Sequence, residues 1–139
     1  MGNGTEGITP TLTEFLLARI AEDEADARES AYEGQRWVPE EEAVVAADRD
    51  LEPLLFLDRK CDARHAARWS PNRVLAECEA RRAAIEDAWG VHLQIEGEWG
   101  YGKGSEQLEA ENDQPDVVRH LAAVYADHPD YDEAWRAEG

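Results

Sequence analysis

Residues 70–90 read SPNRVLAECEARRAAIEDAWG, and this stretch carries signals for both ends of one helix. Ser70 can cap the first turn, and Pro71 suits the first helical position because the N–H that proline lacks is not needed there. Apolar residues recur at helical spacing and form one face: Val74, Leu75, Cys78, Ile85 and Trp89. Gly90 favours the left-handed conformation that ends many helices. The pattern predicts a central packing helix.

Two more long helices are predicted on either side of it. Thr11 and Glu14 match a capping box, so the first helix begins at residues 10–11, and Gly34 ends it. The last helix begins at Pro115 and stops at residues 127–129, before a proline. Their buried faces are predicted to comprise Leu12, Phe15, Leu16 and Ile20 in the first helix, and Val117, Val118, Leu121 and Tyr125 in the last.

The remaining segments are shorter. Residues 36–57 predict two or three strands, one of which has a helical alternative, and residues 58–68 predict a short helix. Residues 91–96 alternate apolar and polar side chains, which favours a half-buried strand. Residues 98–112 are irregular, and residues 131–136 predict a terminal turn capped by Asp130.

The fold class is therefore α+β. It is mostly helical, with three main helices, a short terminal helix and a small antiparallel sheet. We expect a disordered tail at residues 1–9 and a single globular domain at residues 10–136.

The formal net charge of −18 is the most unusual bulk property. It disfavours binding to nucleic acid and to anionic membranes, both of which require Lys and Arg, and it permits a basic protein partner. No apolar run is long enough to span a bilayer, and no secretory leader begins the sequence. Two cysteines are too few for a disulfide framework, so we expect reduced thiols and a cytoplasmic protein.

The later turns of the first helix carry an acidic cluster of Glu22, Asp23, Glu24, Asp26 and Glu29. Negative charge at that end opposes the helix dipole, and like charges at helical spacing repel. Helix stability therefore does not explain the cluster, which leaves two interpretations: solvation, or a docking surface for a basic protein. A second candidate binding element is the loop WGYGKGS, with Trp99 and Tyr101, whose rings could also fold back on the core.

Cys61 and His65 lie four residues apart on one predicted helix face, and with His128 or Asp62 they form a candidate zinc set. No second Cys or His pair lies nearby, so the sequence predicts no metal and no cofactor. His65 and His128 are also the candidate acid–base residues of a small enzyme. No nucleophile motif accompanies them, and a non-enzymatic role is favoured.

Three segments resemble an uncharacterised family, a domain of unknown function found in small acidic proteins of actinobacteria and their phages. They are HAARWSPNRVLAECEARRAAI (65–85), LAAVYADHPDYDEAW (121–135) and the acidic start FLLARIAEDEADAR (15–28). The resemblance implies no activity. Members often carry cysteines just before the last helix, which imply a metal knuckle, but this sequence has none between Val91 and Gln114.

The sequence thus favours an acidic binding or regulatory protein that acts through protein–protein interaction. Three alternatives remain: a nucleic-acid mimic that inhibits a DNA-binding protein, a small enzyme using His65 and His128, and an oligomeric assembly module. An apolar surface patch around Trp37, Trp99 or Trp135 would indicate assembly.

Overall fold

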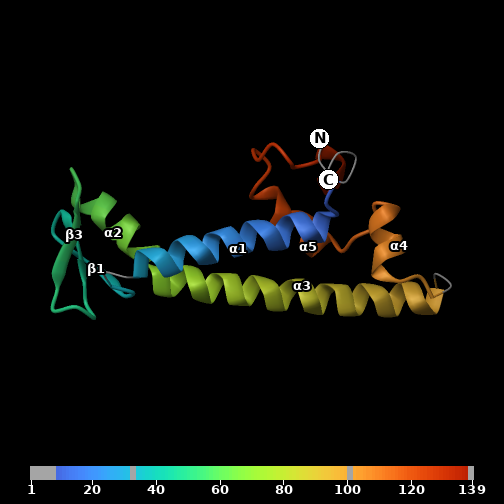
Figure 1. The fold of residues 1–139 in the computed structure, drawn as a ribbon, viewed down its shortest axis with the longest axis horizontal. Helices are drawn as coiled ribbons and strands as arrows, with labels where there is room; N and C mark the ends of the chain where they lie inside the picture. Colours follow the sequence, from blue (N-terminus) through green and yellow to red (C-terminus); the bar gives the residue numbers. More distant parts are fainter. Residues whose placement is uncertain (1–8, 32–33, 100–101, 138–139) are drawn as a thin grey trace, which may run out of the picture. The chain divides into compact units, whose positions relative to one another are not determined.

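The computed structural model describes residues 9–31, 34–99 and 102–137, with side chains omitted for residues 97–99 (Figure 1). In chain order the elements are α1 (Leu12–Ser30), β1 (Trp37–Glu40), β2 (Ala43–Ala46), β3 (Glu52–Phe56), α2 (Lys60–Arg68), α3 (Pro71–Trp99), α4 (Ser105–Ala110), α5 (Asp116–Ala123) and the 3-10 helix η2 (Glu133–Trp135). The prediction of a mostly helical α+β fold with a small antiparallel sheet is confirmed. The predicted tail, apart from Thr9, lies outside the described residues.

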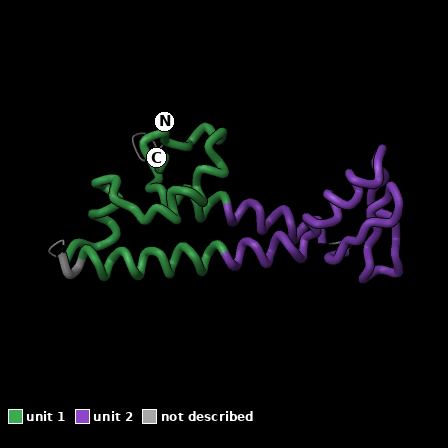
Figure 2. The backbone as a smooth tube through the Cα atoms, turned by 180° about the vertical axis from the view of Figure 1, so that it is seen from behind, with its two compact units in different colours: residues 1–19, 81–139 green, residues 20–80 purple. Residues whose placement is uncertain are grey.

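Two compact units make up the chain, and Figure 2 colours them separately. One comprises residues 1–19 and 81–139, and the other comprises residues 20–80, so α1 and α3 each contribute to both. In the first unit the indole N–H of Trp89 donates to the hydroxyl of Thr13 at 2.9 Å. In the second unit the thiol of Cys78 lies 3.9 Å from the carbonyl oxygen of Ile20. The two long helices therefore contact each other within each unit.

The predicted capping box at the start of α1 is confirmed. The backbone N–H of Glu14 donates to the hydroxyl of Thr11, and the N–H of Thr11 donates to the Glu14 carboxylate. Two of the unpaired donors of the first turn are satisfied in this way. The predicted apolar stripe is buried as well, with Leu12, Phe15, Leu16 and Ile20 in the core.

The central helix is longer than predicted. Gly90 does not end α3, which continues to Trp99, and the strand predicted for residues 91–96 is helical instead. The reason is that buried Ile85 and Trp89 are followed at helical spacing by half-buried Leu93, so the packing stripe continues past the glycine. An exposed glycine inside a helix costs only about 1 kcal/mol relative to alanine, which such packing can offset.

The sheet has the order β1-β2-β3, and both pairs are antiparallel. A bulge between Val44 and Val45 shifts the register of β2 against β3. Helix α2 packs against β1 and β2, where Val44, Ala63 and Ala67 form a buried cluster. Among the described residues β3 pairs with β2 alone, so its other edge is open.

The segment after α3 differs from the prediction in two places. Residues 105–110 form helix α4 within the stretch expected to be irregular, and Leu108 of α4 is fully buried. Helix α5 ends at Ala123, earlier than predicted, and Val117 on its predicted buried face is exposed. Among the described residues, no helix is both long and apolar enough to cross a membrane.

An aromatic cluster attaches the C-terminal segment to α1. The ring of Phe15 lies 5.3 to 5.8 Å from the rings of His128, Tyr131 and Trp135. Tyr131 and Trp135 also contact each other at 5.6 Å, in agreement with their predicted spacing. The cap of the terminal turn is Asp132 rather than Asp130, because the Asp132 carboxylate accepts the N–H of Ala134.

Candidate functional site

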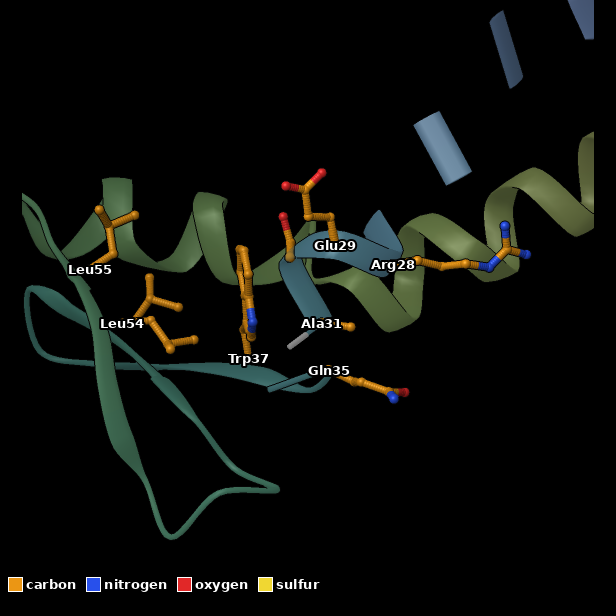
Figure 3. Close-up of a pocket in the computed structure, with 9 residues that line it drawn as sticks. Arg28, Glu29, Ala31, Gln35, Trp37, Leu54 and Leu55 are labelled. Atoms are coloured by element: carbon orange, nitrogen blue, oxygen red, sulfur yellow. The ribbon is translucent and has the colours of Figure 1, made fainter. Parts of the chain in front are cut away.

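A groove of about 900 Å³ lies between the end of α1 and the sheet in the second unit (Figure 3). Figure 3 shows Trp37 of β1 between the leucines of β3 on one side and the end of α1 on the other. The lining is largely apolar and comprises Ala31, Trp37, Val44, Leu54 and Leu55, together with Arg28, Glu29, Ser30 and Gln35. An apolar concavity with a few polar groups at its margin is the common form of a binding site.

Trp37 is held in this groove by the segment that joins α1 to β1. Its indole N–H donates to the carbonyl oxygen of Gly34 at 2.9 Å. Gly34 has φ +144°, and a Cβ there would lie 2.6 Å from the Cβ of Ala46, so only glycine fits without strain. The carboxylate of Asp48 accepts the backbone N–H groups of Gln35 and Arg36, each at 3.0 Å. Backbone geometry therefore sets the position of the indole ring.

Asp48 makes this connection sensitive to pH. The N–H groups of Gln35 and then Arg36 lower the pKa of the Asp48 carboxyl below its ordinary value, because they stabilise the charged form. A lowered folded-state pKa adds stability that is present above the unfolded pKa and is lost as the pH falls through the folded value.

We therefore expect Asp48→Asn to be less stable than the parent at neutral pH. The difference should shrink below the ordinary aspartate pKa of about 3.9. Urea titration at a series of pH values measures this effect, with Asp58→Asn as the control at an exposed aspartate. A stability difference that is constant with pH would contradict the role assigned to the Asp48 carboxylate.

Large apolar side chains are exposed in β3 and at the residue that precedes it. The exposed fractions are 54% for Leu51, 42% for Leu55 and 75% for Phe56. An open strand edge offers unpaired backbone groups, and large exposed apolar side chains beside it are typical of an interaction surface. Pro53 on the same strand has no N–H to donate, which limits uncontrolled pairing of the edge.

The α1 side of the groove carries acidic side chains. Glu29 lines it, and exposed Asp26 lies about one turn earlier on α1. Arg28 lines the groove too, but Figure 3 shows its side chain extending away from Trp37. Basic groups on a bound segment would therefore meet carboxylates at this margin.

The sequence-predicted binding residues have different positions. All members of the acidic cluster lie on α1: Glu22, Asp26 and Glu29 are exposed, and Asp23 and Glu24 are half-buried. Of the five, Glu29 alone lines the groove. Trp99 is the last residue of α3, and Tyr101 lies outside the described residues, as does part of the loop proposed around them.

The suspected zinc and catalytic residues are divided between the two units. Cys61 and His65 are exposed on α2 in the second unit, and the Cys61 thiol lies 3.8 Å from the carboxylate of Asp62. His128 belongs to the first unit, where its Nδ1 accepts the backbone N–H of Asp130 and its ring packs edge-on against Phe15. These contacts give His128 a packing role.

Sequence reasoning missed the groove itself. The sequence predicts short strands for its apolar residues but no cavity. The signal for an exposed apolar surface is that β3 carries apolar side chains at three consecutive positions, Leu54 to Phe56. A half-buried strand alternates instead. A second group that was missed, His92 with Glu96 and Asp113, has the side-chain chemistry to hold a metal ion.

Comparison with known proteins yields one family model, described as a family of unknown function (DUF6221), which matches residues 9–137. No curated protein matches the chain, and no solved structure does.

Proposed function

The chain belongs to DUF6221, a family of unknown function, and we propose from its geometry that it is a non-enzymatic protein that binds a basic partner protein. The bound element is an extended segment of the partner that carries aliphatic and basic side chains. The observation that supports this proposal is the apolar groove around Trp37, which is lined in part by Leu54 and Leu55 of β3.

The shape and chemistry of the groove favour an extended segment. Leu54 and Leu55 line the groove and also belong to the open-edged strand β3. A strand added to that edge gains main-chain hydrogen bonds, while its alternate side chains can enter an adjacent pocket. Affinity then comes from the backbone and the apolar contact, and selectivity comes from the side chains.

Charge favours a basic partner over a second copy of this chain. Each copy carries a formal net charge of −18, so self-association would bring like charges together. A basic segment would instead be attracted to Glu29, which lines the groove, and to exposed Asp26 about one turn earlier on α1. This interpretation gives the acidic half of α1 a role in steering the partner, since electrostatic complementarity mainly raises the association rate and specificity.

The test uses a labelled extended peptide that alternates Lys with Leu, with Glu–Leu and Lys–Ser peptides for comparison. We expect fluorescence anisotropy to show binding of the Lys–Leu peptide only, and the binding should weaken as salt screens the carboxylates. Leu55→Asn should reduce the affinity about tenfold or more, as expected for a side chain central to an interface. Val124→Asn is the matched control, because Val124 is an exposed aliphatic residue outside the groove.

Charge reversal separates the electrostatic contribution from the apolar one. Glu29→Lys should lower the affinity for the Lys–Leu peptide several-fold at low salt and much less at high salt. Glu106→Lys on α4 makes the same change at an exposed site outside the groove and should have a smaller effect. Equal binding of the Glu–Leu peptide, or an unchanged affinity of Leu55→Asn, would overturn the proposal. Concentration-dependent self-association that Leu55→Asn abolishes would support the assembly alternative instead.

One further proposal concerns the cellular location of this protein. Cys61 is an exposed free thiol, which suits a reducing compartment and supports a cytoplasmic location. The nucleic-acid mimic that inhibits a DNA-binding protein remains a prediction from the sequence.

A further inference from the structure

Three side chains of different elements converge in the first unit. His92 and Glu96 lie on α3, and Asp113 lies in the connection between α4 and α5. One potential ligand atom from each of the three side chains lies within 4.8 Å of the others. The Nε2 of His92 is 3.1 Å from an Oδ1 of Asp113. All three residues are half-buried, and the exposed fraction of the His92 side chain is 19%.

The helical extension of α3 is what creates this group. In the strand predicted for residues 91–96, His92 and Glu96 would be separated by about 13 Å, four residues at ~3.3 Å each. In a helix, residues four apart have Cβ atoms about 5 to 6 Å from each other. The group therefore depends on the continuation of α3 past Gly90.

Local structure fixes the third member. Asn112 adopts φ +57°, a left-handed conformation that asparagine tolerates better than most residues. The next backbone N–H, that of Asp113, donates to the carbonyl oxygen of Leu108 at 2.8 Å. The ring of Trp89 packs edge-on against the His92 ring, with centroids 5.5 Å apart. Asp113 and His92 are thus both held by their surroundings.

We propose that His92, Glu96 and Asp113 bind a divalent transition-metal ion, with Zn²⁺ as the first candidate. One imidazole nitrogen and two carboxylate oxygens form a ligand set that Zn²⁺ accepts, and three protein ligands leave a fourth position of a tetrahedral site open. Such a site would hold water or a small molecule at the open position. The proposal does not depend on the peptide groove, which lies in the other unit.

Lys103 lies beside several carboxylates of this region. Its ammonium group pairs with Glu111 at 2.8 Å, and this pairing is the main cause of its raised pKa, to which the carboxylates of Glu96 and Asp113 add. A lysine attracted to the two proposed carboxylate ligands competes with a metal ion for their charge. Lys103→Gln should therefore bind the metal several-fold more tightly than the parent.

Calorimetric titration of the full chain with Zn²⁺ tests the site directly. We expect one ion per chain, and His92→Gln and Asp113→Asn should each weaken binding about tenfold or more, a loss that removal of even a supporting side chain can cause. His120→Ala is the matched control at an exposed histidine on α5. The double variant Cys61→Ser, His65→Ala should also bind like the parent.

Cobalt gives a second measurement that is independent of affinity. Co²⁺ at the proposed site should show no thiolate charge-transfer absorption, because its protein ligands are nitrogen and oxygen. A thiolate band that disappears in the Cys61→Ser, His65→Ala variant would place the metal on α2 and overturn the proposal. Undiminished binding by both His92→Gln and Asp113→Asn, or no binding of Zn²⁺ at millimolar concentration, would overturn it too.

Discussion

Phe15→Ala is expected to reduce the free energy of unfolding by about 3 to 5 kcal/mol, the usual cost of emptying a buried phenylalanine site. Phe15 is 1% exposed, and its ring contacts the rings of His128, Tyr131 and Trp135. The substitution therefore removes buried apolar area and also the aromatic contacts that attach the C-terminal segment to α1. Urea titration followed by circular dichroism measures the loss.

The chain provides a matched control, because its other phenylalanine is on the surface. Phe56 is 75% exposed on β3, and Phe56→Ala should change stability by no more than about 0.5 kcal/mol. Equal losses in the two variants would show that the aromatic cluster around Phe15 contributes little.

Ile85→Ala is expected to cost about 2 to 5 kcal/mol, since Ile85 is 4% exposed on the packing face of α3. The loss combines the transfer of the removed methyl groups with the cavity that remains in a rigid core. The same titration measures it, with the midpoint and slope compared with those of the parent.

Leu75→Ala provides the comparison on the same helix. The sequence predicts Leu75 as part of the buried face, but the structure shows it half-buried. The substitution should cost less than about 2 kcal/mol, because part of the side chain already contacts water. A larger loss for Leu75→Ala than for Ile85→Ala would contradict the burial pattern of α3.

Short sequence motifs correctly predicted the helix starts and contacts that depend on neighbouring residues. The Thr11–Glu14 capping box predicted the start of α1, and Pro71 predicted the start of α3. The spacing of Tyr131 and Trp135 predicted that their rings contact each other. Each of these signals acts over one or two turns of chain, so the residues involved are close in the sequence. Short apolar runs predicted two or three strands in residues 36–57, but neither the register of their pairing nor the bulge between Val44 and Val45.

The end of α3 shows the limit of local signals. Gly90 predicts a stop, and the alternation of Val91, Leu93 and Ile95 predicts a strand, yet α3 continues to Trp99. Both patterns describe local preference, which is worth about 1 kcal/mol per residue or less. Burial of an apolar stripe stabilises a helix by more than these local preferences. Whether a surface is present to bury the stripe depends on elements distant in sequence.

The sequence by itself determined the fold class, the beginnings of the two long helices and the negative charge, because these follow from residue identity and short-range spacing. Tertiary structure alone decided the groove and the proposed metal-ligand group. Trp37 and Leu55 come to line the same groove only through the pairing of β1 and β3 with β2. Asp113 reaches His92 only because the chain turns back after α4. Contacts between distant residues depend on which buried surfaces fit together, and that choice is made by the whole chain.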